Sequence, residues 1–337
     1  MADEPLRPGK LPAHLLARLL ASVPHHDPRV LVGPRVGSDA AVIDIGGGRV
    51  LVAKTDPITF AADDLGWYAV HVNANDIACM GARPMWMLAT ALLPPASPAS
   101  LASTIFQQLV AACRPLAIEL VGGHTEVTFG IDRPMLVAAM LGEAAIEDVI
   151  RGDEIAPGDA VLIAGAIAIE GTALLARERP AALARAGVPD ATIARAQRLL
   201  RHPGISIVRH AEALRAAIRP KLFHDATEGG LATALAEVAT RADAGIRIDP
   251  GAVPVLDETR TVCAALGLDP LGLLASGALL AVTEPPGERS LPEGWRTIGT
   301  VVTAEPGVIM VTDGDTPLPA FERDELARFF ESEAAGT

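Results

Sequence analysis

The sequence predicts an α/β (α+β) protein made of two consecutive domains. Its 337 residues are typical of two domains or of one large one. Runs of β-branched and apolar residues alternate with segments of helical spacing in both halves, which is typical of mixed α/β domains. The pattern pauses around 151–159 and then starts again. We therefore divide the chain into an N-terminal helical segment (1–30), a first domain (31–148), a second domain (149–313) and a C-terminal helical tail (314–337).

The elements of the first half follow from periodicity. Helical spacing predicts helices at 11–23, 64–80 and 100–116, and β-type runs predict strands at 40–45, 49–54, 86–94, 118–123 and 135–144. In the second half we predict strands at 160–165, 222–226, 245–250, 273–284 and 307–312 and helices at 206–218 and 230–242. Segment 177–204 is helical and polar, and we interpret it as a surface excursion.

A glycine triplet at 46–48 joins the first two strands and indicates a hairpin. If the chain turns there, Ile45 faces Arg49. Asp39 then lies opposite Thr55 at the open end of the hairpin, with Asp56 one residue away. A slip of register would change which side chains share a face but would leave both acids at the same end.

Composition narrows the classes of function. The 41 acidic and 28 basic residues give a net charge of −13, which argues against a general nucleic-acid or anionic-membrane surface. The first residues do not read as a signal peptide, and we expect no membrane-spanning segment. Cys79, Cys113 and Cys263 lack CxxC spacing and stand in apolar contexts, which favours buried thiols. We expect a soluble, cytoplasmic protein.

Acidic and amide side chains gather at the ends of the first-domain elements. Asn73 and Asp76 lie three residues apart on the predicted helix and so share one surface. Together with Asp39 and Asp56 they would suit a hard cation such as Mg²⁺, with phosphates arriving on the metal. The simpler alternatives are that Asp39 and Asp56 terminate strands and that Asp76 caps a helix restarting after Asn75.

Two glycine pairs are candidates for approach to a ligand. The first is Gly122-Gly123-His124-Thr125-Glu126, which we place at the end of a strand, although His124 read alone is an ordinary loop histidine. The second is His224-Asp225-Ala226-Thr227-Glu228-Gly229-Gly230, where a strand passes through a tight loop into a helix whose N-terminus favours anions. An ordinary turn with a capping residue remains the alternative there. No GxxxxGK[ST] pattern is present, so a P-loop is excluded.

The order of these motifs resembles the AIR synthase (PurM-like) superfamily. The resemblance rests on SDAAVI (38–43), KTDPI (54–58), NANDIACMGARP (73–84), GGHTE (122–126) and HDATEGGLATAL (224–235), and runs from about residue 30 to 312. It is strongest toward HypE and HypE-like AIR synthase-related proteins, because TVCAALGLDPLGLLASGALLAV (261–282) follows the HypE pattern of a helix, a GLD turn and a strand. The superfamily also includes aminoimidazole ribonucleotide synthetase, selenophosphate synthetase and thiamine-monophosphate kinase.

The resemblance implies a PurM-like fold in which the first domain pairs with its twin into a dimeric β-barrel and binds ATP and Mg²⁺. It further implies a C-terminal α/β domain that covers the nucleotide cleft. The metal ligands would be Asp39, Asp56 and Asp76. The nucleotide would be contacted by Asn73, Gly122, Gly123, His124, Thr125, Asp225, Thr227, Gly229 and Gly230. On this interpretation Asp76 is tolerated inside a helix because a divalent cation, and not a lysine, neutralises it.

Three departures from the family pattern bear on activity. The third motif commonly reads GGDT, whereas His124 stands here in place of the aspartate. HypE proteins end in a reactive cysteine, and this chain has none after Cys263. The HypE motif NEG is replaced by Ala275-Ser276-Gly277, so a glutamate is missing. We therefore do not expect thiocarbamate dehydration.

Two hypotheses remain. The first is a homodimeric enzyme that uses Mg²⁺ and ATP to phosphorylate or activate a small molecule by positioning and charge neutralisation. The second is a nucleotide-binding accessory protein that assists the maturation of a hydrogenase-type metalloenzyme with a partner protein and without chemistry of its own. Phosphate release from Mg-ATP in the presence of cell metabolites separates them. The sequence does not name the acceptor or the catalytic residues.

Overall fold

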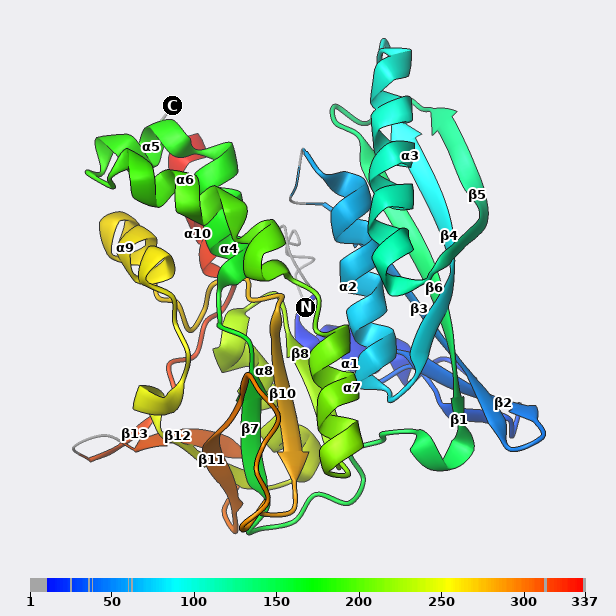
Figure 1. The fold of residues 1–337 in the computed structure, drawn as a ribbon, viewed down its shortest axis with the longest axis vertical. Coiled ribbons are helices and arrows are strands. Elements are labelled where there is room, and N and C mark those ends of the chain that lie inside the picture. Colours follow the sequence, from blue (N-terminus) through cyan, green and yellow to red (C-terminus); the bar gives the residue numbers. More distant parts are fainter. Residues whose placement is uncertain are drawn as a thin grey trace. The chain divides into compact units, whose positions relative to one another are not determined.

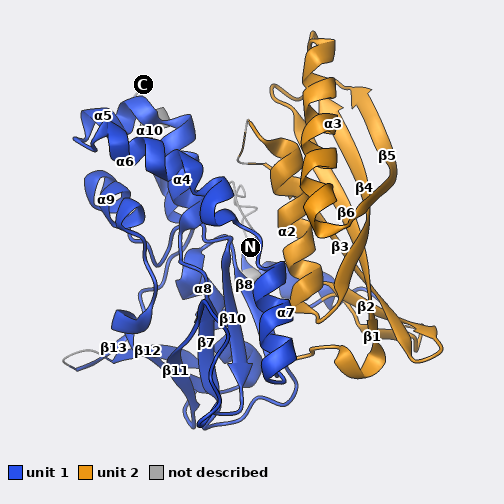
Figure 2. Ribbon diagram, in the orientation of Figure 1, with its two compact units in different colours: residues 1–24, 35–37, 152–337 blue, residues 25–34, 38–151 orange. Residues whose placement is uncertain are grey.

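The computed structural model of the protein describes residues 11–24, 26–35, 37, 39–59, 61, 63–311 and 314–335. The chain divides into two units (Figure 2), each with its own sheet. Unit 1 comprises Met1–Pro24, Arg35–Gly37 and Gly152–Thr337, and unit 2 comprises His25–Pro34 and Ser38–Arg151.

Unit 2 is built on a six-stranded sheet of order β1-β2-β3-β6-β4-β5 (Figure 1). Its strands are β1 (Val30–Val32), β2 (Ala41–Gly46), β3 (Arg49–Ile58), β4 (Arg83–Leu93), β5 (Glu119–Val127) and β6 (Met135–Ala145). Its helices are α2 (Leu65–Cys79) and α3 (Ala99–Cys113), with single 3-10 turns at Arg114–Leu116 and Ile146–Asp148. Helix α2 packs on β3, β4 and β6, and α3 packs on α2. The helices therefore form one layer and the sheet another.

The β2–β3 hairpin has the predicted register along its length but a different turn. Ala41 pairs with Ala53 and Ile43 with Leu51, in the series that the sequence predicts. An irregularity then makes Gly46, and not Ile45, the partner of Arg49.

The other face of this sheet is only partly covered. From Met135 to Gly142, strand β6 alternates between half-buried and buried residues, and the half-buried ones are apolar: Met135, Val137, Ala139 and Leu141. Strand β5 is an edge strand and almost every one of its residues is exposed. No second sheet closes a barrel over this face within the described part of one chain. The dimeric barrel remains a prediction.

Unit 1 has a seven-stranded sheet of order β13-β12-β9-β11-β7-β10-β8, antiparallel except where β12 runs parallel to β9. Its strands are β7 (Ala160–Ala164), β8 (Leu222–Ala226), β9 (Gly245–Ile248), β10 (Ala278–Thr283), β11 (Trp295–Val302), β12 (Gly307–Val311) and β13 (Asp315–Pro317). Its α-helices are α1 (Ala13–Leu20), α4 (Ile169–Glu178), α5 (Pro180–Arg185), α6 (Asp190–Arg198), α7 (Val208–Ala217), α8 (Gly230–Ala242), α9 (Asp257–Leu266) and α10 (Glu325–Ala335), with short helical turns at Leu200–Gly204 and Pro250–Ala252. All residues of β7, β8 and β10 are buried, so these strands form the core.

Three differences from the sequence-based interpretation concern packing. Helix α2 is continuous to Cys79, so the suggested restart after Asn75 is wrong. Segment 177–204 is not a polar excursion, because Leu183, Ile193 and Leu200 are buried and its helices pack on α4 and α9. Strands β1, β11 and β13 were not predicted, and β13 adds a strand to the segment expected to be only helical.

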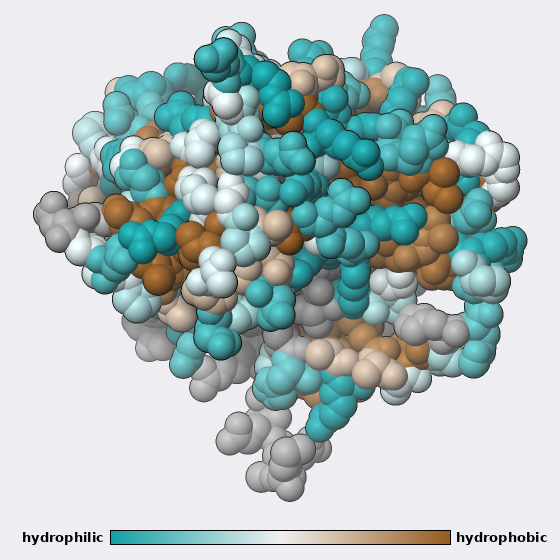
Figure 3. Space-filling view, turned by 90° about the horizontal axis from the view of Figure 1, so that it is seen from below, coloured by the Kyte–Doolittle hydropathy of each residue, from teal (hydrophilic) through white to brown (hydrophobic). Residues whose placement is uncertain are grey.

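The surface carries scattered apolar residues. On the face drawn in Figure 3, hydrophobic residues reach the surface in separate patches between hydrophilic ones. Cys79, Cys113 and Cys263 are buried free thiols, as predicted. Among the described residues, none of the helices combines the length and the hydropathy needed to cross a membrane.

Candidate functional site

Three of the predicted carboxylates surround a lysine in unit 2. Lys54 and Asp56 continue the row of the buried Val50 and Val52 on the face of β3 that α2 covers, and Asp76 of α2 reaches the same place. The Lys54 Nζ atom lies 3.1 Å from Asp76 Oδ2 and 3.5 Å from Asp56 Oδ2. The side chain of Asp76 is only 6% exposed, and that of Lys54 21%. A cation supplied by the chain itself therefore sits among these acids.

This geometry corrects the interpretation of Asp76. We expected a divalent cation, and not a lysine, to neutralise it. The exclusion of a lysine is wrong, because Lys54 forms an ion pair with Asp76, whereas a divalent cation at Asp76 stays a prediction. The two residues are 22 positions apart in sequence, so only the packing of α2 on β3 reveals the pair.

The electrostatics of Lys54 confirm that the carboxylates act on it together. Burial alone lowers the pKa of Lys54, but the charges of Asp76, Asp56 and Asp39 outweigh burial and raise its pKa above the ordinary value. The ammonium is thus fully charged at neutral pH. Asp39, which precedes β2, is part of the same cluster of charges.

The donor atoms at this cluster fit a hard cation. Mg²⁺ prefers carboxylate and amide oxygens, which Asp39, Asp56 and Asp76 offer here. Asn73 is fully buried one turn before Asp76, and its Nδ2 donates to the Ala69 carbonyl at 2.9 Å. The Asn73 Oδ1 atom has no hydrogen-bond partner among the described residues. Buried polar atoms are rarely left in this state, so a ligand or water is the expected partner.

The motif GGHTE does not join this cluster within one chain. It lies inside β5 and not after a strand, so the predicted loop is wrong. His124 of β5 pairs with Thr90 of β4, and Thr90 pairs with Val137 of β6. Val137 in turn pairs with Pro57 of β3, which is next to Asp56. Three strand spacings of about 4.8 Å put His124 roughly 14 Å from the row of Asp56.

The exposed His124 side chain has a local partner. Its Nε2 lies 3.2 Å from Glu126 Oε2. Gly122 and Thr125 are exposed on the same strand, whereas Gly123 is required by the sheet, because a Cβ there would meet the Ala89 carbonyl oxygen at 1.9 Å. Contact of these four residues with a nucleotide stays a prediction.

In unit 1 the predicted glycine loop connects β8 to α8. Asp225 is buried near the end of β8, and the Thr227 carbonyl accepts from the N–H groups of Gly230 at 3.0 Å and Ala275 at 3.2 Å. Gly229 and Gly230 both have positive φ, and a Cβ on Gly230 would meet the Leu271 carbonyl at 2.4 Å. The loop therefore presents the N-terminus of α8 in a conformation that needs glycine. Such a terminus attracts phosphate.

Two buried acids next to this loop were missed by sequence reasoning. Asp324 accepts from the backbone N–H groups of Gly229 (2.7 Å), Leu326 (2.7 Å) and Leu274 (3.3 Å), and so holds the loop against the C-terminal segment. Burial raises the pKa of Asp324 to about 6, against these three hydrogen bonds. A lone aspartate ahead of a helix carries no sequence signal for a partner 95 residues away.

Glu170, the second of these acids, stands in the first turn of α4. Burial raises its pKa to about 7, hydrogen bonds from Ser276 oppose the rise, and the charges of Asp324 and Asp225 add to it. Its Oε2 atom has no hydrogen-bond partner among the described residues. Ser276 is the residue that replaces the HypE glutamate, so a carboxyl group from another element lies against it.

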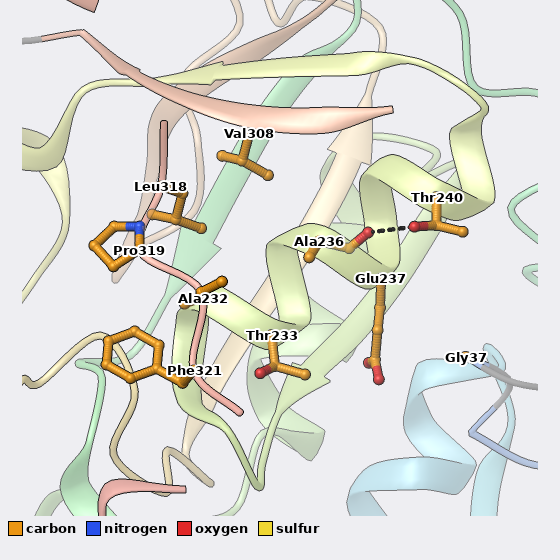
Figure 4. A pocket seen from close by; sticks show the side chains of 11 residues that line it. Gly37, Ala232, Thr233, Ala236, Glu237, Thr240, Val308, Leu318, Pro319 and Phe321 are labelled. Atoms are coloured by element: carbon orange, nitrogen blue, oxygen red, sulfur yellow. Dashed lines mark hydrogen bonds between the residues drawn. The ribbon is translucent and has the colours of Figure 1, made fainter. Parts of the chain in front are cut away.

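Unit 1 also contains a cavity of about 370 Å³. Helix α8 forms one wall with Ala232, Thr233, Ala236, Glu237 and Thr240, as Figure 4 shows. Val308 and the segment 318–321, with Phe321, face it across the cavity. Its size and mainly apolar lining are those of a small-ligand pocket. The cavity lies along α8, the helix that begins directly after the glycine loop.

Comparison with known proteins places the chain. The family model of the AIR synthase related protein, N-terminal domain, matches residues 37–144. The model of the AIR synthase related protein, C-terminal domain, matches residues 156–311. Carbamoyl dehydratase HypE of Rhizobium leguminosarum bv. viciae is 32% identical over 260 residues, which are 75% of this chain and 71% of that protein. The chain belongs to the AIR synthase-related (PurM-like) family.

Solved structures agree on the fold of this AIR synthase-related protein. The hydrogenase maturation protein HypE in complex with ATP superposes with a TM-score of 0.64 at 24% identity and covers 93% of this chain and 91% of its own. ThiL complexed with AMPPCP and TMP superposes with a TM-score of 0.72 at 21% identity. The match covers 92% of this chain and 94% of the ThiL chain. These structures show the same fold, and the family models with the 32% identical HypE relative make the chain PurM-like and HypE-like.

Proposed function

We propose that this AIR synthase-related protein binds ATP with Mg²⁺ and phosphorylates or otherwise activates a small molecule. The observation that carries the proposal is the carboxylate cluster of unit 2, where Asp39, Asp56 and Asp76 act together on Lys54. One helical turn before Asp76, the buried amide oxygen of Asn73 has no hydrogen-bond partner among the described residues. The two structural neighbours, HypE in complex with ATP and ThiL in complex with AMPPCP and TMP, support a nucleotide as the ligand.

Each group has a role that its chemistry allows. Asp39, Asp56 and Asp76 would hold Mg²⁺, which when bound neutralises phosphate charge. Asn73 would orient the ligands through its free oxygen. In unit 1, Thr227, Gly229 and Gly230 would border the phosphates at the N-terminus of α8, and Asp225 would lie beside them.

The proposal is tested by incubating the protein with Mg-ATP and a metabolite extract, and following phosphate release and new phosphorylated masses. Metabolite-dependent phosphate release with a phosphorylated product supports the enzyme. Tight nucleotide binding with neither signal favours the alternative, a nucleotide-binding accessory protein in hydrogenase-type maturation that acts on a partner protein. The His124 departure from the third motif is the observation that favours this alternative.

Replacement of Asp76 by alanine is expected to weaken Mg-ATP binding by about 1–3 kcal/mol, since it removes a buried charged ligand and leaves Lys54 without its nearest partner. Calorimetric titration measures the loss. Asp132→Ala, in an exposed turn of the same unit, is the matched control and is expected to leave the affinity unchanged. Equal affinity in both variants would remove Asp76 from the site.

We also propose that the protein is a homodimer formed by unit 2. An edge strand with unpaired backbone groups next to a half-covered apolar sheet face is a surface that proteins normally bury. Changing Val121 and Val127, which are 55% and 60% exposed on β5, to lysine together is expected to halve the mass seen by light scattering. Val110→Lys, on α3 at 57% exposure, is the control and should remain a dimer. A wild-type monomer at micromolar concentration contradicts the proposal.

A further inference from the structure

Lys54 occupies the place where a metal ion would compete for the same oxygens. Its ammonium is within 3.1 Å of Asp76 and 3.5 Å of Asp56, and it belongs to the same strand as Asp56, two residues earlier. It is therefore tethered to the cluster and is present whether or not a metal is bound.

An ammonium group and a divalent cation repel each other when both lie against these oxygens at close range. The repulsion between two cations rises steeply when they approach within about 4 Å of each other in a partly buried site. The lysine side chain, however, is a flexible four-carbon stem with three rotatable donors. With 21% of it already exposed, Lys54 has a route away from Asp76 toward solvent.

We propose that Lys54 is a displaceable counter-cation: a divalent metal entering among Asp39, Asp56 and Asp76 expels the ammonium from Asp76, and the ammonium then binds a phosphate oxygen of the nucleotide. The inference rests on the proposed function and adds a residue to its site. Once the carboxylates are taken up by the metal, a phosphate is the acceptor of opposite charge that arrives with the nucleotide, and lysine is a common point-charge partner of phosphate.

Displacement makes metal and nucleotide bind cooperatively. When the metal binds alone, its binding free energy is reduced by the cost of breaking the Lys54 ion pairs. When nucleotide is also present, the displaced ammonium gains a phosphate partner, which offsets that cost. Because such coupling is reciprocal, each ligand strengthens the binding of the other. A purely structural lysine would show no coupling of this kind.

The first test follows the lysine itself in the wild-type protein. The sequence contains only three lysines, Lys10, Lys54 and Lys221. Brief acetylation followed by mass spectrometry is expected to show slow labelling of Lys54 alone, faster labelling with Mn²⁺, and slow labelling again with Mn²⁺ and AMPPCP. Lys221, which pairs with Asp159 at 2.9 Å in unit 1, is the internal control and should label equally in all three conditions. Labelling of Lys54 that does not change with Mn²⁺ overturns the proposal.

The second test uses Lys54→Met and electron paramagnetic resonance of Mn²⁺. The variant is expected to bind Mn²⁺ alone roughly tenfold more tightly than wild type, and AMPPCP at saturating Mn²⁺ at least about fivefold more weakly. Lys221→Met should change neither. A change of both affinities in the same direction would mean a structural role and would contradict the inference. If Lys54→Met does not fold, the labelling experiment decides alone.

The two proposals fail differently. If neither wild type nor variant binds Mn²⁺ or AMPPCP, the proposed function falls and takes the inference with it. If wild type binds both and Lys54 neither changes its labelling nor affects the two affinities, only the inference falls.

Discussion

Replacing Glu170 by glutamine is expected to raise the free energy of unfolding by about 3 kcal/mol at pH 8 and by little at pH 5. The carboxyl group is buried at the start of α4, and burial raises its pKa to about 7 from the ordinary 4.5. That difference corresponds to about 3 kcal/mol between protonated and ionised forms. Glutamine keeps the shape and removes the charge.

The sign of the pH dependence follows from the raised pKa. The folded state holds the proton more tightly than the unfolded state, so the contribution of Glu170 is fully present below pH 4.5 and is lost as the pH rises through about 7. Wild-type stability should therefore fall between these values with a slope that Glu170→Gln lacks. Denaturant unfolding at pH 5, 6, 7 and 8 measures both curves.

Glu178→Gln supplies the control for this experiment. Glu178 closes the same helix but is partly exposed. Its substitution should shift the curve little and leave the slope unchanged. If the free energies of unfolding of wild type and Glu170→Gln change with pH in parallel, the pKa of Glu170 is not raised by burial.

The second large effect is expected at Gly123. Alanine there would place its Cβ 1.9 Å from the Ala89 carbonyl oxygen, and the backbone φ of +151° disfavours any side chain. Because the obstacle is backbone of the neighbouring strand, β4 and β5 must move apart, at a cost of about 3 kcal/mol or more. Thermal and denaturant unfolding measure the loss.

The adjacent glycine is a matched control with a different meaning. A Cβ on Gly122 would meet nothing nearer than the Leu88 Cδ2 atom at 3.9 Å, so Gly122→Ala should fold normally. If this variant binds Mg-AMPPCP more weakly while keeping its stability, Gly122 serves the ligand. Equal stability of both variants would mean that the close approach of β4 and β5 is not needed.

Periodicity predicted much of the fold because most elements bury one clear face. Helix α2 and strands β3, β6 and β8 lie where their apolar spacing indicates, and the hairpin register followed from the position of its glycines. Strand β5 was cut short because the glycine pair was interpreted as a strand end. The sheet instead uses Gly123 to approach β4, which local sequence does not reveal.

The sequence predicted that these acids gather, but it did not predict their partners. Acids recognised by motif came together where β3 and α2 pack, but Lys54 was overlooked because its role depends on which face of β3 it occupies. Glu170 and Asp324 were missed for a related reason. Their partners Ser276 and Gly229 lie on other elements, and burial, which no single-residue signal reports, gives them their properties.

The hydrogen bonds of Asp324 have a consequence for local unfolding. One carboxylate joins the glycine loop, the segment around Leu274 and the start of α10, which are far apart in sequence. None of the three can open without leaving a buried N–H or the carboxylate itself unsatisfied, so they form one cooperative opening unit. A substitution that weakens the packing of α10 would therefore also increase local opening of the glycine loop, although no residue of that loop had changed.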